Sequence, residues 1–253
     1  MWREIGKAFR LLGTLGDDTR CILLIGNGKS FCAGIDVTDP SFGLMNTLDD
    51  DDESMDVARR CLSFRPKILE MQNCLSAIEE CPIPVVAAIH GSCIGGGIDL
   101  ICCADIRICT PTTTFSVREA KLGLAADVGT LQRLPKIIGN TSIVRELCFT
   151  GKNFDGVEAE RIGLVSRSTT SQNDLIASGL DICKCIAGNS PVAVTGTKLS
   201  LNYSRDHSVK DGLEHIALHN AAALMTNDLS AAFVASSTKS DAEFDSLLPH
   251  AKL

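Results

Sequence analysis

The sequence lacks any hydrophobic run long enough to cross a membrane. Its 253 residues are 45% hydrophobic and 22% charged, which is ordinary for a globular protein. No stretch approaches the roughly 18 consecutive apolar residues that a membrane-spanning helix requires. The N-terminus carries neither the apolar core of a secretion signal nor an Arg- and Ser-rich transit pattern. We therefore expect no membrane partner, and a core large enough for one domain or one domain plus a helical extension.

Paired cysteine motifs are absent although the chain has twelve cysteines. No C-x-x-C pair occurs, and Cys183 and Cys185 are too close to form half of a zinc site. Disulfide frameworks belong to short secreted chains. We expect reduced thiols that pack as small hydrophobic side chains, and no metal. The cysteines within apolar runs are Cys21, Cys93, Cys102, Cys103, Cys109 and Cys148.

A basic charge balance is also missing. The chain has 24 basic and 31 acidic residues and a net charge of −7, which disfavours nucleic acid or an anionic membrane as the main partner. A local cluster of donors would still suit a small anionic ligand. The run Asp49–Glu53 has five adjacent acids; a metal site or a site for a basic partner is the alternative, but a solvated loop is our interpretation.

Hydrophobic periodicity predicts an α/β core followed by a helical layer. Helical spacing covers residues 2–15, 56–81, 98–103, 131–138, 142–149 and 158–162. Short apolar runs predict strands at 21–25, 85–89, 106–109, 114–117 and 164–168. Residues 173–187, 191–204, 208–225 and 228–237 all read as Ala-rich helices with polar caps. This order predicts an α/β fold with a helical C-terminal layer.

The glycines Gly95–Gly97 lie between an apolar strand and an apolar helix. The dinucleotide pattern G-x-G-x-x-G is absent, so a nucleotide cofactor is disfavoured. Glycines at a helix start expose backbone N–H groups, and the helix dipole adds positive potential. Such a site stabilises negative charge on an oxygen. A tight packing turn between strand and helix is the alternative.

Three carboxylates follow these glycines in apolar surroundings: Asp99, Glu119 and Asp127. An acid in such company is costly to bury unless it is hydrogen-bonded or has a task. Three acids near one oxyanion site would suit proton transfer next to a carbonyl. For Asp99 a structural role is equally open, because an acid in the first turn of a helix complements the helix dipole.

Other catalytic patterns are weak or absent. The chain has no G-x-S-x-G elbow for a serine nucleophile. His215 and His219 have the i, i+4 spacing of metal sites on a predicted helix, but no third ligand is evident. His90 stands at the end of a predicted strand, where a structural hydrogen bond is the simpler role.

The order of motifs resembles the enoyl-CoA hydratase/isomerase (crotonase) superfamily over nearly the whole chain. The resemblance begins with A-G-x-D, the H-G that ends a strand, the G-G-G-x-acid-L helix start and A-D-I-R. These stand at Ala33–Asp36, His90-Gly91, Gly95–Leu100 and Ala104–Arg107. It continues through Gly129–Pro135, Phe149–Lys152, Gly163–Ser166, Ser190–Val194 and Tyr203–Val209.

Within the superfamily the chain is most similar to the Δ(3,5)-Δ(2,4)-dienoyl-CoA isomerases. Those enzymes carry G-L-A-A-D-V-G, intact here at Gly123–Gly129, whereas hydratases have a glycine-rich P-G-x-G-G at that place. The resemblance implies a spiral of repeated ββα units that binds an acyl-CoA thioester. It also implies isomerisation of 3,5-dienoyl-CoA in fatty-acid β-oxidation without a cofactor, coenzyme A being part of the substrate. An enoyl-CoA hydratase, or a non-catalytic binding or assembly protein of the same fold, is the alternative.

The resemblance also assigns roles to residues. The backbone N–H groups of Ile35 and Gly96 would hold the thioester oxygen, and Cys32, Ala33, Gly34 and Asp36 would complete the substrate-binding segment. Glu119 and Asp127 would form the acid/base pair that removes a proton at C2 and returns one at C6, assisted by Asp99. Protonation at the far end of a conjugated dienolate requires a remote acid, which Asp127 would supply.

The family pattern further sets expectations for organisation. Residues 1–188 would form the core and residues 189–253 a helical region that assembles a homotrimer or homohexamer. The family's first strands are not found ahead of Met1, and Ala120-Lys121 replaces an apolar–acid pair, which would bring a positive charge near the acyl pocket. Ala251-Lys252-Leu253 is close to the S-K-L peroxisomal address. We expect the peroxisome or a related organelle, with the mitochondrion as the alternative.

Overall fold

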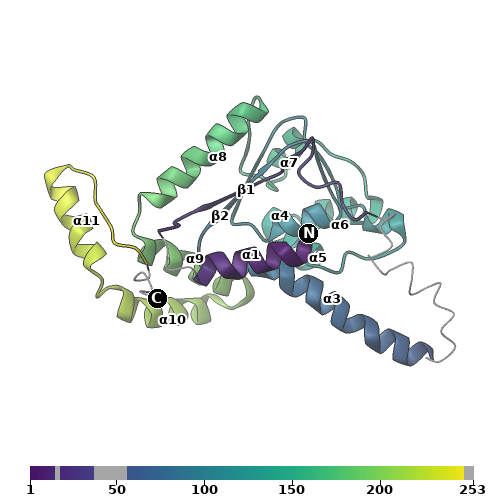
Figure 1. Cartoon of the computed structure of the whole chain (residues 1–253), viewed down its shortest axis with the longest axis horizontal. Helices are drawn as coiled ribbons and strands as arrows, with labels where there is room; N and C mark the ends of the chain where they lie inside the picture. Colours follow the sequence, from purple (N-terminus) through teal and green to yellow (C-terminus); the bar gives the residue numbers. More distant parts are fainter. Residues whose placement is uncertain (15–17, 37–55, 248–253) are drawn as a thin grey trace.

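The computed structural model describes residues 1–14, 18–36 and 56–247. The acidic run Asp49–Glu53 and the terminal Ala251-Lys252-Leu253 lie outside these residues, so the expectations for them stay predictions. The described chain forms two parallel sheets, helices around them, and a C-terminal set of helices to one side (Figure 1).

A four-stranded parallel sheet forms the centre of the fold. Its order is β1 (Ile22–Ile25), β2 (Val85–Ile89), β4 (Ile106–Cys109) and β6 (Arg167–Ser168). All five residues of β2 are buried, as expected for a parallel strand that is covered on both faces. Helix α8 (Gln172–Ala187) packs against β1, β2 and β4.

A smaller parallel layer follows the same order. Strand β3 (Ser92–Ile94) pairs with β5 (Thr114–Ser116), and Cys32 forms a parallel bridge to Cys93 of β3. Three successive segments, near Cys32, in β3 and in β5, therefore lie side by side. Each comes a few residues after a strand of the larger sheet.

This arrangement is a spiral of ββα turns. The first turn runs from β1 through Cys32 to α3 (Val57–Glu80), and the second from β2 through β3 to α4 (Gly96–Cys102). The third runs from β4 through β5 to the 3₁₀ helix η2 (Glu119–Leu122) and α5 (Thr130–Ile138). The expected fold class is therefore confirmed. Each turn adds one segment to the small sheet, next to the segment from the turn before.

Outer helices complete the core. Helix α1 (Trp2–Thr14) lies against α3 and buries Gly6 and Phe9; a Cβ atom on Gly6 would lie 2.9 Å from Cys74 Cβ, so the two helices are in close contact. Helices α6 (Thr141–Thr150) and α7 (Gly156–Arg161) follow α5. Asn140 and Asp155 cap them through side-chain oxygens, which satisfies backbone N–H groups that lack partners in the helix.

The C-terminal layer contains α9 (Pro191–Asp206), α10 (Val209–Ala223) and α11 (Asn227–Thr238), of which α11 lies farthest from the sheet in Figure 1. Helix α9 is joined to the core by the buried Lys198. Its Nζ donates to Asp105 Oδ2 at 2.8 Å and to the Ile83 carbonyl at 3.1 Å. The ammonium group is thus paired and hydrogen-bonded, as a buried charge must be.

The predicted elements are largely confirmed, with three differences, of which one is the unexpected 3₁₀ helix η2. Strand β3 was not expected, because it lies between Gly91 and the glycine run Gly95–Gly97, which together indicate a turn. The strand expected at 164–168 is only Arg167–Ser168, since Leu164 and Val165 donate to the Ala159 carbonyl at the end of α7. None of the twelve cysteines forms a disulfide. Four of the six expected in apolar runs are buried, and Cys21 and Cys148 are half-buried.

Candidate active site

The glycine run makes a sharp turn between β3 and α4. Gly95 has φ 53° and ψ −120°, a conformation that glycine adopts without steric cost. Its N–H donates to the Ser116 carbonyl of β5. Gly96 begins α4, and a Cβ atom placed on it would have nothing within 4 Å. The Gly96 N–H is therefore at a helix start beside open space.

The segment Cys32–Asp36 lies against the same turn. The Cys32 N–H donates to Ser92 O, and Ile94 N–H donates to Cys32 O, both at 2.9 Å. Gly34 has φ 97°, and a Cβ there would lie 3.2 Å from the Ile94 carbonyl oxygen, so glycine permits the close approach. Within the described residues, neither Ile35 nor Gly96 donates its N–H to a partner. The two predicted oxyanion donors thus belong to neighbouring turns of the spiral.

Glu119 closes this site from the third turn. It begins η2 three residues after the end of β5, and it is 6% exposed. A Cβ atom on Gly95 would lie 3.3 Å from Glu119 Oε1, while Oε2 is buried without a partner among the described residues. Burial raises the pKa of the Glu119 carboxyl, and the charges of Asp99 and Asp127 raise it further. A carboxyl so placed is suited to exchange a proton with a substrate held at the turn.

Asp99 has a structural contact of its own. It is 1% exposed, and its Oδ1 accepts a 2.6 Å hydrogen bond from the backbone N–H of Thr130. It thereby caps α5, since the preceding residue, Gly129, supplies no side-chain cap. Burial raises the pKa of Asp99, and the charge of Asp127 adds to the effect despite the bonds from Thr130. Asp99 thus has the structural role that the sequence left open, and it also lies near enough to Glu119 to affect its pKa.

Asp127 differs from the other two acids, because its residue is exposed. Apolar neighbours in the sequence do not bury it, since it lies on the loop between η2 and α5. Its backbone carbonyl accepts a 2.6 Å hydrogen bond from Gln72 Nε2 of α3. Sequence reasoning missed Gln72, because the two partners are 55 positions apart in the sequence and no local signal indicates the contact.

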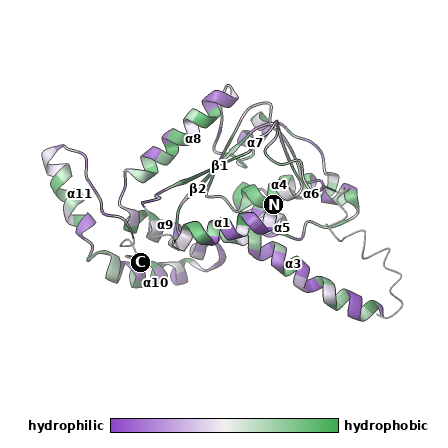
Figure 2. Cartoon of the chain, in the orientation of Figure 1, coloured by the Kyte–Doolittle hydropathy of each residue, from purple (hydrophilic) through white to green (hydrophobic). Residues whose placement is uncertain are grey.

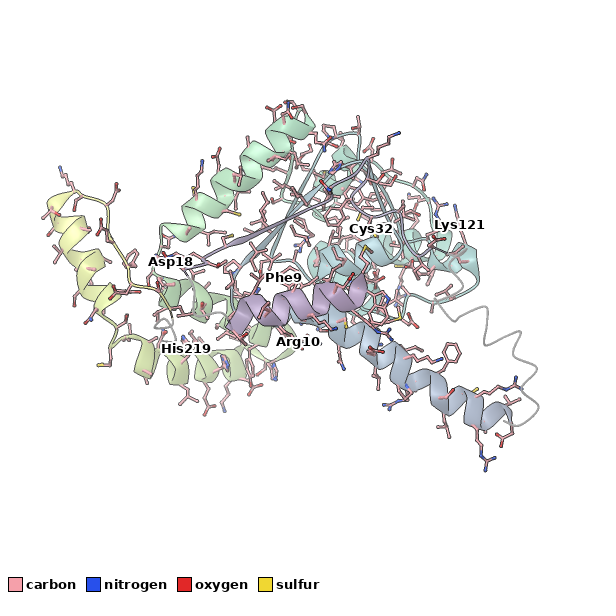
Figure 3. The ribbon with its side chains drawn as sticks, viewed as in Figure 1. Phe9, Arg10, Asp18, Cys32, Lys121 and His219 are labelled. Carbon is pink, nitrogen blue, oxygen red and sulfur yellow. The ribbon has the colours of Figure 1, made fainter. Side chains whose placement is uncertain are left out.

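Lys121 was expected to bring a positive charge near the acyl pocket. Its stem packs on Gly151, where a Cβ atom would lie 3.1 Å from Lys121 Cγ, and the residue is exposed. Cys32 and Lys121 both lie on the side of the molecule away from α10 and α11 (Figure 3).

Other features of the described residues do not form a second centre. No group of three His, Cys, Asp or Glu residues there is placed to hold a metal ion, and no helix there is long and apolar enough to cross a membrane. His215 stacks on Tyr203 with ring centroids 4.1 Å apart, and His219 packs against Gly196. The His90 ring bonds the Gly28 carbonyl at 2.8 Å, which is the structural role expected for it.

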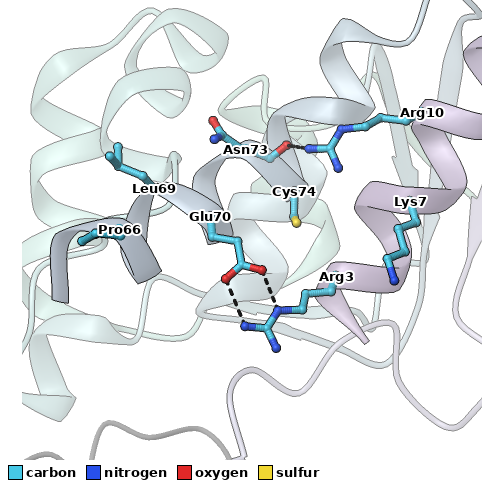
Figure 4. A pocket seen from close by; sticks show the side chains of 8 residues that line it. All are labelled: Arg3, Lys7, Arg10, Pro66, Leu69, Glu70, Asn73 and Cys74. Carbon is cyan, nitrogen blue, oxygen red and sulfur yellow. Dashed lines mark hydrogen bonds and ion pairs between the residues drawn. The ribbon is translucent and has the colours of Figure 1, made fainter. Parts of the chain in front are cut away.

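A groove of about 470 Å³ lies between α1 and α3. Arg3, Lys7 and Arg10 line it from α1, but Arg3 forms two hydrogen bonds with Glu70, and Arg10 donates to the Asn73 carbonyl (Figure 4). Arg3 is therefore paired with an acid, and Arg10 is hydrogen-bonded to a backbone carbonyl. The groove is formed by helices on the outside of the fold, and it includes none of the predicted site residues.

Residues 1–231 match the model of the family described as enoyl-CoA hydratase/isomerase. The chain belongs to this family. A rat protein named mitochondrial Δ(3,5)-Δ(2,4)-dienoyl-CoA isomerase is 43% identical over 242 residues, which are 96% of this chain and 72% of the rat protein. An Arabidopsis thaliana protein named peroxisomal Δ(3,5)-Δ(2,4)-dienoyl-CoA isomerase is 43% identical over 91% of this chain and 81% of its own length.

Solved structures of the family have the same fold. A putative enoyl-CoA hydratase from Streptomyces coelicolor A3(2) superposes with a TM-score of 0.83 at 27% identity, covering 97% of this chain and 84% of that one. An enoyl-CoA hydratase from Bacillus anthracis gives 0.82 at 25% identity, covering 96% and 87%. The sequence resemblance to the crotonase superfamily is thus confirmed.

Proposed function

We propose that this protein is a Δ(3,5)-Δ(2,4)-dienoyl-CoA isomerase that acts in fatty-acid β-oxidation. Relatives with that name are about 43% identical over most of the chain. The observation that carries the proposal is the position of the acids. Glu119 lies beside the Gly95 turn, and Asp127 lies on a separate loop held by α3. One acid near the thioester and a second, separate acid suit a proton shift along a conjugated chain.

The proposed reaction begins with the thioester oxygen at the N–H groups of Ile35 and Gly96. Glu119 takes a proton from C2, and the negative charge of the resulting dienolate collects on the oxygen that these donors hold. Asp127, in its protonated form, then gives a proton to C6, which leaves the 2,4-diene. Glu119 afterwards loses its proton to water and the exposed Asp127 takes one up, so the cycle closes. Asp99 supports the loop through Thr130 and, by its charge, helps to keep the pKa of Glu119 raised.

No cofactor enters this proposal. The substrate and the product differ only in the positions of protons and double bonds, so no electrons are supplied or removed overall. Two carboxyl groups and two backbone donors can perform both transfers. Dialysis against EDTA should leave the turnover rate unchanged, and a loss that added metal restores would contradict this part of the proposal.

The decisive assay follows the conjugated 2,4-dienoyl-CoA as its absorbance appears from 3,5-dienoyl-CoA. Asp127→Asn should lower kcat at least about 100-fold, which is within the range for loss of an acid–base group, while KM stays near the wild-type value. Asp181→Asn is a matched control, because Asp181 is an exposed acid on α8. Full isomerase activity in Asp127→Asn would contradict the role of Asp127.

An enoyl-CoA hydratase is the second candidate, because the solved structures named above carry that name. Hydration adds a water molecule across a 2,3 double bond and does not need an acid at C6. We expect the chain to turn over 3,5-dienoyl-CoA with a higher kcat/KM than 2-enoyl-CoA. The reverse order would favour the hydratase. Salt-sensitive binding of RNA without turnover would favour a non-catalytic protein of the same fold.

We also propose that the chain assembles into a trimer or a dimer of trimers through its C-terminal helices. Large apolar side chains are exposed there, and Figure 2 shows hydrophobic stretches on α10 and α11. They include Leu213, Leu218, Met225, Phe233 and Val234. So many large apolar side chains exposed in one region of the chain favour an interface there. Light scattering should give three or six chain masses for the wild type and a smaller mass for Leu218→Asp with Phe233→Asp.

The organelle belongs to the proposal as well. The relatives are named mitochondrial or peroxisomal, and we propose the peroxisome for this chain. A fluorescent protein fused ahead of residue 1 should co-localise with a peroxisomal marker. A mitochondrial pattern would contradict this assignment.

A further inference from the structure

One face of α3 contacts the loop that carries Asp127 and the helix that follows it. Gln72, Ser76 and Glu79 have i, i+4 and i+7 spacing, which places them on one side of a helix. Gln72 Nε2 donates to the Asp127 carbonyl at 2.6 Å. Arg133 of α5 donates to Ser76 Oγ at 3.0 Å and to Glu79 Oε2 at 2.9 Å. Three polar side chains of α3 thus hold a single stretch of chain, 127–133.

The Glu79 contact is a largely buried ion pair. The side chains of Arg133 and Glu79 are 13% and 15% exposed, and Arg205 of α9 also binds Glu79. Burial alone would raise the pKa of Glu79, but hydrogen bonds from Arg205 and Arg133 bring it below its ordinary value. Glu79 therefore stays ionised and paired, and α5 is fixed to α3 near its middle.

The loop between Asp127 and α5 is fixed at its other end too. Thr130 N–H is held by Asp99. Gly129 has φ 137°, a backbone conformation that favours glycine, and a Cβ atom there would lie 2.1 Å from an Arg133 guanidinium nitrogen, which would have to move aside. The backbone from residue 129 onward is thus held by several contacts. Residue 127 is held to α3 by the single hydrogen bond from Gln72.

The Asp127 carboxylate, by contrast, makes no hydrogen bond within the described residues. Its location therefore follows from the backbone that carries it. We propose that Gln72 is a positioning residue that sets where Asp127 delivers its proton. The inference rests on the proposed function, because it takes Asp127 as the acid at C6. A displacement of about 1 Å at a reacting group can lower a rate about 100-fold.

The test compares Gln72→Met with the wild type. Methionine keeps the length of the side chain and suits a helix, but it cannot donate to the Asp127 carbonyl. We expect kcat for 3,5-dienoyl-CoA to fall about 10- to 100-fold with KM changed less than about 3-fold. Gln72→Glu should fall at least as far, since its carboxylate places a second acceptor against the carbonyl.

A second measurement distinguishes a misplaced Asp127 from a loss of folded enzyme. In D₂O, the variant should still remove the C2 proton through Glu119, while delivery at C6 is slowed. Recovered substrate should then carry more deuterium at C2, and the ratio of exchange to isomerisation should rise at least about 10-fold, as the lower rate of delivery implies. A partly unfolded sample would lower both rates together and leave that ratio unchanged.

Asn73→Met is the matched control. Asn73 is the next residue of α3, it is exposed, and its side chain makes no hydrogen bond in the described part of the chain. It should keep the wild-type kcat and exchange ratio. A normal kcat in Gln72→Met, or an unchanged exchange ratio, would overturn the positioning role when Asp127→Asn is inactive. Full activity in Asp127→Asn would instead overturn the proposed function, and this inference with it.

Discussion

Replacing Glu119 by glutamine should make the protein more stable while it removes the activity. Glu119 is 6% exposed, and its Oε2 has no partner among the described residues. A buried polar atom left unsatisfied costs about 1–3 kcal/mol, and more if it is charged. Glutamine keeps the shape but carries no charge, so the free energy of unfolding should rise by about 1–2 kcal/mol at pH 8.

The pH dependence gives this prediction a sign that can be checked. Folding raises the pKa of Glu119 above its ordinary value of 4.5. At pH values between the pKa of the unfolded chain and that of the folded chain, the native state therefore binds more protons than the unfolded state. Stability is therefore lost as the pH rises through that window and regained as it falls. The advantage of Glu119→Gln over the wild type should be largest at pH 8 and shrink toward pH 5.

Thermal unfolding followed by circular dichroism at pH 8 and at pH 5 measures both effects. A gain of 1–2 kcal/mol corresponds to a melting temperature roughly 3–6 °C higher in a chain of this size. Glu158→Gln is a control of opposite sign, because a hydrogen bond from Arg161 lowers the pKa of that surface acid. A lower melting temperature for Glu119→Gln at pH 8, or a gap equal at both pH values, would refute the reasoning.

Substitutions at three further residues test contacts near the site and in the core that supports it. Asp99→Ala should cost about 2 kcal/mol of unfolding free energy in urea, because the buried Thr130 N–H loses its acceptor, whereas Asp99→Asn should cost less than half of that. Lys198→Met should cost about 2–3 kcal/mol by the same measurement, since it leaves Asp105 without its cation; an unchanged midpoint would contradict the anchor. Gly95→Ala should lower the free energy of unfolding by about 1–3 kcal/mol, because of backbone strain at φ 53°. It should also lower kcat. Wild-type turnover in that variant would argue against the turn as the oxyanion site.

The parts of the site that the sequence predicts are those with local signals. Three adjacent glycines before an apolar helix indicate a tight turn with free N–H groups. Asp99 and Glu119 likewise have apolar neighbours in the sequence, and both are buried. Strand β2 was predictable because a run of five apolar residues at that place suits a parallel strand buried on both faces.

The rest depends on contacts between distant segments. Asp127 has apolar neighbours in sequence yet is exposed, because its loop lies outside the sheets. Gln72 reaches that loop across 55 residues, and one glutamine on a long helix has no pattern that would indicate this. Leu164 and Val165 read as a strand but close α7, since the Ala159 carbonyl is within reach of both N–H groups.

The spiral described above divides the site among its turns. Ile35 comes from the first turn, Gly96 from the second, and Glu119 and Asp127 from the third. In the proposed reaction, the donors for the thioester oxygen and the two acids therefore stand in separate stretches of the chain. Under that proposal, the side chain at position 127 can change without altering the N–H groups of Ile35 and Gly96, because the Asp127 carboxylate makes no hydrogen bond within the described residues. A scaffold of this kind can acquire a new reaction on an old substrate class through a few local substitutions, and the acid at position 127 is where such a change would act first.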